Sequence, residues 1–274
     1  MKQILSIFSL FSTTVVVLIF LFLSYFSAPL IKSNLSLFSL NWSPPNSYGL
    51  MPMLLSTLLI ATLATTFAYI NALSVALFLN RLKRGKLKLI LQTLFNILGS
   101  IPTVVYGFLG VILLVPFIRE LSYSSGYNII SAAITLSFLI TPTIVLFLID
   151  SFDKTKNEYK LIVCAIGGNT IDYQLKVLLK VNKKALIVAA IMGFSRAIGD
   201  TMIALMVAGN SIKIPDSLSS SVRTLTSHIA LTYGGDFDSI EFKTIFASGL
   251  ILFFISLNIL IAIKAVGKKN EQSI

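Results

Sequence analysis

The chain has 274 residues, of which 55% are hydrophobic and only 12% charged, and its mean hydropathy is +0.88. Apolar runs of about 20 residues, the length that crosses the hydrocarbon of a bilayer, recur along the chain, so the composition excludes an ordinary soluble domain and indicates a polytopic membrane protein. The net charge of +11 would suggest nucleic-acid binding in a soluble protein, but here it predicts basic loops that fix orientation in the membrane, with lipid and no nucleic acid as partner.

The first apolar run extends from about Ile4 to Ile31, directly after Lys2. It is long for the apolar region of a signal peptide and lacks a clear small-residue cleavage site, so we expect a retained first span. With the later runs it predicts an all-α fold of six transmembrane helices, at about 11–31, 51–79, 90–118, 128–150, 186–208 and 244–265. We expect residues 1–274 to form a single integral membrane domain.

Lys and Arg are distributed unevenly between the two sides of these spans. Sixteen lie on one side, namely Lys2, Arg81, Lys83, Arg84, Lys86, Lys88, Lys154, Lys156, Lys160, Lys176, Lys180, Lys183, Lys184, Lys264, Lys268 and Lys269. The other side has only five, namely Lys32, Arg119, Lys213, Arg223 and Lys243. Because cytoplasmic loops carry an excess of Lys and Arg, this distribution predicts that both termini are cytoplasmic.

Two prolines lie inside predicted spans. Pro102 follows Gly99 and Ser100 in the third span, and Pro142 lies in the fourth. Each removes a helix hydrogen bond, so we expect a kink or a local opening at both positions. The kinks either serve packing or free backbone groups that line a polar path through the membrane.

A predicted cytoplasmic loop, 151–185, connects the fourth and fifth spans. Within it, the segment TIDYQLKVLLK places four apolar residues at helical spacing, namely Ile171, Leu175, Leu178 and Leu179. Gly167 and Gly168 can break the chain before this helix, and Asn169 or Thr170 can cap it. Such an amphipathic helix either lies on the membrane surface or presents an apolar ridge to a cytoplasmic partner, and the spacing alone does not choose.

Ionisable residues in the fifth predicted span are the main candidates for a substrate path. Arg196 and Asp200 are four residues apart, so in one helix they would share a face and could pair; Ser195 and Thr201 flank them. Either charge alone is costly at bilayer depth, about 2.5–3.5 kcal/mol on insertion scales. One interpretation is a structural ion pair. The other, which we favour, is that Arg196 offers its donors to a passing oxyanion while Asp200 orients or releases it.

The loop and the fifth span resemble the signature region of binding-protein-dependent ABC importer permeases. The usual signature is Glu-Ala-Ala, three residues, Gly, nine residues, Ile, one residue and Leu-Pro. With Gly167 as its glycine, Val177 falls at the Ile position and Leu179 at the Leu position. The sequence departs from the pattern at 161–163, where LIV replaces Glu-Ala-Ala, and at Lys180, which replaces the proline.

Other segments resemble phosphate importer permeases. GFSRAIGDTMIALMVAGN is similar to their Arg-Ala-Leu-Gly-Glu-Thr stretch, with Asp200 in place of Glu. NWSPPNSYGLMPMLLSTLLI, IPTVVYGFLGVILLVPFIRE and IPDSLSSSVRTLTSHIAL echo the same family, in the same order. The Trp-x-Pro entry and the RTLT outer loop resemble the PstC-type subunit more than its PstA-type partner. Arg223 and His228 fall in that outer loop, where they either face a binding protein or are simply solvated.

The resemblance implies the fold of a type I ABC importer permease and one channel-forming half of an ATP-driven phosphate importer, paired with a second homologous permease subunit. A dimeric cytoplasmic ATP-binding subunit would dock on the loop helix through Gly167, Gly168, Ile171, Leu175, Val177 and Leu179. An extracytoplasmic phosphate-binding protein would deliver the substrate. The chain has no Gly-x-x-x-x-Gly-Lys-Ser/Thr phosphate cradle, one cysteine and one histidine, so we expect no ATPase or other enzyme activity, no cofactor and no metal site.

Three alternatives to this interpretation stay open at the sequence level. The chain could be a permease for another oxyanion such as molybdate or sulfate, because Arg recognition does not separate tetrahedral anions well. It could also be the PstA-type subunit. From a different class, an ATP-independent channel or secondary carrier would give the 167–180 helix no function.

Overall fold

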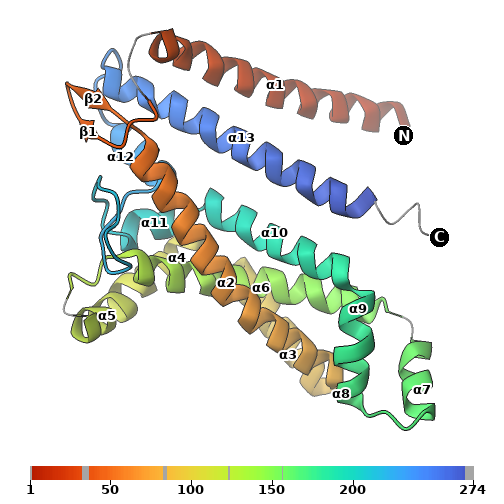
Figure 1. Ribbon diagram of the computed structural model, residues 1–274. Helices are drawn as coiled ribbons and strands as arrows, with labels where there is room; N and C mark the ends of the chain where they lie inside the picture. The colour runs from red at the N-terminus through yellow and green to blue at the C-terminus, as the bar shows by residue number, and fades with distance from the viewer. Residues whose placement is uncertain (1, 33–36, 83–84, 123, 156, 269–274) are drawn as a thin grey trace.

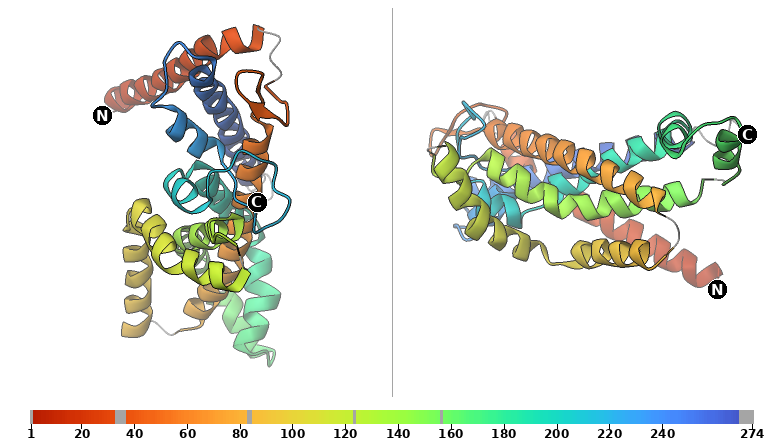
Figure 2. Two further views of the ribbon diagram at one scale, coloured as in Figure 1. Left: turned by 90° about the vertical axis from the view of Figure 1, so that its left-hand side faces the viewer. Right: turned by 90° about the horizontal axis from the view of Figure 1, so that it is seen from below.

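The computed structural model describes residues 2–32, 37–82, 85–122, 124–155 and 157–268, which are mostly helical (Figures 1 and 2). Five helical segments in this described part are long and apolar enough to cross a membrane, namely Phe8–Leu30, Met51–Arg81, Thr103–Leu121, Ile129–Asp153 and Ile240–Gly267. The predicted spans 11–31, 51–79, 128–150 and 244–265 correspond to four of them. The third and fifth predicted spans are interrupted.

The first and last long helices form a pair. α1 (Lys2–Lys32) lies along α13 (Ile240–Lys268), and both the start of α1 and the end of α13 lie at the same end of the molecule (Figure 1). Aromatic rings join the two helices: the centroids of Phe26 and Phe246 are 4.9 Å apart, and those of Phe20 and Phe253 5.4 Å. Most of the described side chains of α1 are exposed, and most of the exposed ones are apolar, as lipid contact requires.

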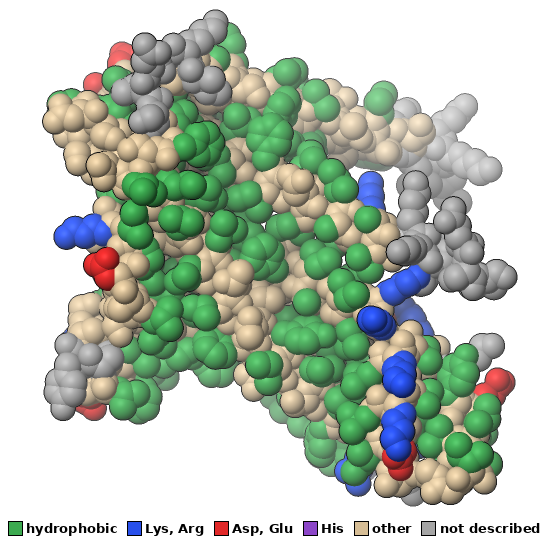
Figure 3. Space-filling view, in the orientation of Figure 1, with side chains coloured by type: hydrophobic (Ala, Val, Ile, Leu, Met, Phe, Trp, Pro, Cys, Tyr) green, Lys and Arg blue, Asp and Glu red, His purple; other side chains and the backbone are tan. Residues whose placement is uncertain are grey.

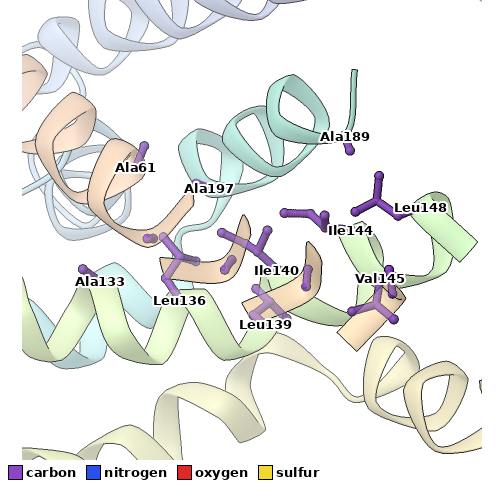
Figure 4. Packing of buried hydrophobic residues seen from close by; sticks show 14 of the residues in the cluster. Ala61, Ala133, Leu136, Leu139, Ile140, Ile144, Val145, Leu148, Ala189 and Ala197 are labelled. Atoms are coloured by element: carbon purple, nitrogen blue, oxygen red, sulfur yellow. The ribbon is translucent and has the colours of Figure 1, made fainter. Parts of the chain in front are cut away.

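The core lies where α2 (Met51–Arg81) packs against α6 (Ile129–Asp153). On α2, buried alanines recur every four residues, at Ala64, Ala68, Ala72 and Ala76, and form one ridge. Small residues let two membrane helices approach closely, which replaces the hydrophobic driving force that is missing between helices in lipid. Leucines and isoleucines of α6 complete this core (Figure 4).

α10 (Lys183–Gly199) lies across α2 and α6. Its small residues Ala189, Gly193 and Ala197 are buried (Figure 4 labels the two alanines). A Cβ at Gly193 would meet Cδ1 of Ile144 at 2.7 Å, so a larger residue here would require the Ile144 side chain to shift, and glycine lets α10 approach α6 without that change.

The third predicted span, 90–118, is wrong as a single helix. The chain forms α3 (Lys86–Ser100), α4 (Thr103–Leu109), the π-helical turn η1 (Gly110–Leu114) and α5 (Val115–Ser122). Pro102 causes the break, because it has no amide hydrogen and keeps Ile101 extended, with ψ 132°. By contrast, α6 continues through Pro142. The α3 helix is attached to the end of α6 by an ion pair, with Nζ of Lys88 2.9 Å from Oδ1 of Asp153.

The fifth predicted span, 186–208, is interrupted too. α10 ends at Gly199, the backbone of Asp200 is extended with ψ 129°, and α11 (Met202–Val207) follows. The segment before α10 contains four short elements, α7 (Asn157–Ala165), α8 (Thr170–Asp172), the π-helical turn η2 (Tyr173–Leu178) and α9 (Leu179–Val181). These elements lie at the end of the molecule where α2 and α6 end and where α1 begins (Figures 1 and 2).

The opposite end consists of a hairpin and a short helix. β1 (Trp42–Ser43) pairs antiparallel with β2 (Ser47–Tyr48), and α12 (Leu225–Thr232) packs against α13. His228 on α12 is fully buried, with Nε2 2.9 Å from Oγ1 of Thr244, so the prediction of a solvated or partner-facing His228 is wrong. Burial, together with the nearby Arg223, lowers the pKa of His228 to about 4.

Candidate functional site

Arg196 lies in the last turn of α10, where that helix crosses α6. Its Nη1 donates a hydrogen bond of 2.7 Å to Oγ1 of Thr143, and the arginine is half-buried. In the described part of the chain, ion pairs join Lys88 to Asp153, Lys154 to Asp150 and Lys176 to Asp172, and none includes Arg196. A guanidinium is always charged and has five donors in a fixed fork, so Thr143 fixes one edge of a permanent cation.

A groove opens beside this contact. Most of its lining surface is apolar, but three of its five lining residues have polar side chains, and we call it the polar groove for that reason. Thr143 lines it together with Asn96, Gly99, Ser100 and Leu146, and its volume is about 350 Å³. Its second wall is therefore the end of α3, where Pro102 interrupts the third predicted span. The interruption itself is bridged by Tyr106, whose hydroxyl donates to the carbonyl oxygen of Leu98 at 2.9 Å. The groove thus forms where sequence analysis located Gly99, Ser100 and Pro102, but Thr143 and Asn96 were not among the predicted site residues.

Asp200 does not act as the partner of Arg196. Because α10 ends at Gly199, the two residues do not share a helix face, and the predicted i,i+4 pair is wrong. Oδ2 of Asp200 instead accepts the backbone N–H of Ile203 at 2.8 Å, and the Asp200 carbonyl accepts Oγ1–H of Thr226 at 3.0 Å. The buried carboxylate therefore caps α11, where the positive end of a helix favours a negative charge.

Ser195 and Thr201 lie on either side of the break and are both half-buried. Thr201 occupies the N-cap position of α11, and its carbonyl accepts the N–H of Leu205 at 2.9 Å. The break therefore brings Ser195, Arg196, Asp200 and Thr201 to one interruption of the backbone, while the guanidinium itself points to α6.

The segment proposed for coupling, which we call the coupling segment (167–181), begins with a tight turn. Gly167 has φ +83°, and Gly168 packs so closely that a Cβ there would lie 2.6 Å from Cγ1 of Val163 and 2.9 Å from its carbonyl oxygen. Asn169 then caps α8 in a capping box: its Oδ1 accepts the N–H of Asp172 at 2.9 Å, and Oδ2 of Asp172 accepts the N–H of Asn169 at 3.2 Å.

An exposed ion pair stabilises the first turn of the coupling segment. Nζ of Lys176 lies 2.7 Å from Oδ1 of Asp172, and this hydrogen bond, together with the backbone N–H of Asn169, lowers the pKa of the Asp172 carboxyl below its usual value. Both side chains are accessible to solvent, so the pair contributes to local order rather than to global stability.

The apolar positions of the coupling segment divide between two environments. Ile171 and Leu175 are 49% and 55% exposed, whereas Leu178 is fully buried and Val177 and Leu179 pack against the core. The predicted ridge is therefore only half available to a partner. Ile171 and Leu175 are four residues apart and form an exposed apolar pair at the end of the molecule.

Comparison with known proteins identifies the family. Residues 72–268, most of the chain, match the family described as "Binding-protein-dependent transport system inner membrane component". The chain belongs to this family. It is accordingly a multi-pass inner-membrane permease of an ABC importer, and it is not an enzyme, because the ATPase of such a system is a separate subunit.

Individual relatives agree with this assignment. The chain is 30% identical over 238 residues to "Probable ABC transporter permease protein YqgH" of Bacillus subtilis, covering 85% of this chain and 77% of the relative. It is 29% identical over 229 residues to "Probable phosphate transport system permease protein PstC" of Methanocaldococcus jannaschii, covering 77% and 72%. A solved structure of the MetNI methionine ABC transporter has the same fold, with a TM-score of 0.63, 18% identity and coverage of 82% and 99%.

Proposed function

We propose that this permease is the PstC-type subunit of an ATP-driven phosphate importer and forms half of its translocation path. The similarity to several PstC proteins over most of the chain supports phosphate as the substrate. A second, homologous permease subunit would complete the path, a dimeric ATP-binding subunit would dock on the coupling segment, and an extracytoplasmic phosphate-binding protein would deliver the anion.

The observation that carries the proposal is the Arg196–Thr143 contact beside a polar groove. Arg196 supplies a permanent positive charge next to a break in α10, and Thr143 orients it from α6. A planar fork of charged donors matches the oxygens of phosphate, which makes the guanidinium suited to a transient anion contact. Ser195 and Thr201 would add hydroxyl donors at the break, and Asp200 would hold the break open by capping α11 rather than by binding Arg196.

The orientation of the subunit belongs to the same proposal. On the face shown in Figure 3, Lys and Arg side chains gather at the end of the molecule that carries α8 and α9. Cytoplasmic ends are rich in Lys and Arg, so the coupling segment and both termini would be cytoplasmic. The exposed pair Ile171 and Leu175 would then face the ATP-binding subunit.

The proposal is tested by uptake into proteoliposomes that contain the complete importer. Arg196→Gln keeps a polar side chain that can donate hydrogen bonds, but it shortens the side chain and removes its charge. We expect phosphate uptake to fall to the background of vesicles without permease, while the complex still assembles. Thr143→Val should weaken uptake less, because it removes only the group that orients Arg196. Uptake near that of the unmodified importer in Arg196→Gln would show that the charge takes no part in transport.

Competition distinguishes phosphate from other oxyanions. Labelled phosphate, sulfate and molybdate are offered to the unmodified importer in parallel. We expect ATP-dependent uptake of phosphate alone; uptake of sulfate or molybdate in its place would assign a different oxyanion, and phosphate uptake without the ATP-binding subunit would indicate a channel or secondary carrier.

A further inference from the structure

Two buried amide side chains, which sequence analysis did not single out, attach the coupling segment to the membrane helices. The first is Gln174 in η2, whose Nε2 donates a hydrogen bond of 2.7 Å to the carbonyl oxygen of Leu77 in the last turns of α2. Only 7% of Gln174 is exposed, and its neighbour Tyr173 is buried as well. This is a contact over 97 positions of sequence between the cytoplasmic segment and a spanning helix.

The second is Asn182, which lies between α9 and α10. Its Oδ1 accepts the hydroxyl of Ser151 at 2.9 Å, and its Nδ2 donates to Oγ1 of Thr155 at 2.8 Å and to the carbonyl of Leu178 at 2.9 Å. Ser151 lies in the last turn of α6 and Thr155 just after its end, so Asn182 binds the chain both before and after this helix end. Only 8% of Asn182 is exposed.

These two contacts have a different character from the packing around them. Apolar contacts such as those of Leu178 are non-directional, and they tolerate sliding of one surface over another. A buried amide fixes both distance and angle, and displacement leaves it without a partner at a large cost. The amides therefore determine how the coupling segment sits on α2 and α6, whereas the apolar residues determine only that it stays there.

The position of Asn182 connects the coupling segment with the proposed anion site. α10 begins directly after Asn182 and carries Arg196, and α6 leads from Ser151 back to Thr143. Along a helix, the 14 residues from Asn182 to Arg196 correspond to roughly 21 Å. The two groups of the Arg196–Thr143 contact are thus carried by the two helices that Asn182 joins at their cytoplasmic end.

We propose that Gln174 and Asn182 are positioning residues that hold the coupling segment, α2 and the end of α6 together as one body, so that displacement of the segment by the ATP-binding subunit reaches α10 and α6 and moves the Arg196–Thr143 pair with them. This inference rests on the proposed function, because it requires an ATP-binding subunit to dock on the coupling segment. It assigns the transmission to two side chains that contact neither substrate nor nucleotide.

The experiment uses the complete importer in proteoliposomes and compares Gln174→Met and Asn182→Ala with the unmodified chain. Gln174→Met keeps the length of the side chain and removes its hydrogen bond. Lys183→Gln serves as the control, because Lys183 is exposed, directly follows Asn182 and lies outside the coupling segment. We expect both anchor variants to assemble and hydrolyse ATP, while phosphate uptake per ATP hydrolysed falls about tenfold, a coupling of typical size. Lys183→Gln should leave this ratio unchanged.

A distance measurement tests the same inference without substrate. The only native cysteine, Cys164, is replaced by Ser, and spin labels are attached to cysteines at Phe78 and Val181, both exposed, on α2 and on the coupling segment. In the unmodified background we expect one narrow distance distribution that a non-hydrolysable ATP analogue does not change, because both sites move together. In the Gln174→Met variant, we expect the analogue to shift or broaden this distance distribution.

The outcomes separate this inference from the proposed function. If uptake per ATP stays constant in both anchor variants, or if assembly, hydrolysis and uptake fall in proportion, the residues are only structural and the inference is overturned. If the unmodified importer transports another oxyanion, the assignment of phosphate fails, while the distance measurement still decides the role of Gln174.

Discussion

At the scale of single residues, the end of a helix changes what a charged side chain can do. Four residues separate Arg196 from Asp200, a spacing that brings side chains together only while the helix continues. Because α10 ends between them, Arg196 contacts Thr143 on α6 and Asp200 caps α11. The Arg196 guanidinium is left beside the polar groove, whereas the Asp200 carboxylate accepts hydrogen bonds from backbone N–H groups.

The different roles of these two residues lead to a prediction for Asp200. Asp200→Asn keeps an oxygen that can accept the N–H of Ile203, so we expect little change in stability. Asp200→Ala leaves that N–H without its acceptor, which should cost about 1 kcal/mol, a typical value for loss of a cap. Thermal unfolding of the purified complex in detergent measures the difference.

The same pair of variants tests the interpretation in which Asp200 and Arg196 form an ion pair. If the Asp200 carboxylate neutralised Arg196, Asn and Ala would be equally harmful, because both remove the negative charge. An equal loss of stability in Asp200→Asn and Asp200→Ala would therefore contradict the capping role.

The scale of whole elements shows why some features could be predicted and others could not. Four long apolar helices follow from hydropathy alone, because length and composition suffice to define them. Pro102 was predicted to open its span and does. Pro142 in the same kind of sequence does not interrupt α6, since a helix packed on several neighbours can tolerate a proline. The break at Asp200 has no proline, and the Asp200 carbonyl accepts a hydrogen bond from Thr226, which a local pattern does not connect with it.

The coupling segment shows the same division. Its glycine turn and its Asn169 cap are local features and were predicted from the sequence. Which apolar positions are exposed is decided by the helices beneath them, so Leu178 could not be distinguished from Leu175 by spacing. The anchors Gln174 and Asn182 bind groups on α2 and α6 far away in the sequence, and for this reason no local signal marked them.

The alanine ridge of α2 gives a prediction at this scale. Ala68 is fully buried in the ridge that packs on α6. Ala68→Leu adds three carbons at a fully buried position of this ridge, so we expect a loss of about 1–3 kcal/mol from overpacking. The control is Phe67→Leu, at an exposed neighbouring position that is expected to change stability by less than about 0.5 kcal/mol. Unfolding temperatures of the two variants in detergent are compared. An unchanged unfolding temperature of the Ala68→Leu variant would mean that α2 and α6 are not closely packed there.

At the scale of the whole molecule, the two ends differ in charge and in the elements that they carry. One end carries the coupling segment, the ion pair of Lys88 with Asp153 and the amide anchors, and it is rich in Lys and Arg (Figure 3). The other end carries the hairpin and α12, where His228 is buried and neutral above about pH 4. This polarity is what a subunit needs if it meets an ATPase on one side and a delivery protein on the other.

The single cysteine allows a direct test of this polarity. Cys164 in α7 is exposed at the end of the molecule that carries the coupling segment. A maleimide that does not cross membranes should therefore label it in inside-out vesicles and not in intact cells, because the positive-inside rule assigns this end to the cytoplasm. For comparison, Ser125→Cys in a Cys164→Ser background lies at the other end, between α5 and α6, and should be labelled in intact cells. Labelling of Cys164 from outside would mean that the subunit has the opposite orientation in the membrane, with the coupling segment out of reach of a cytoplasmic ATPase.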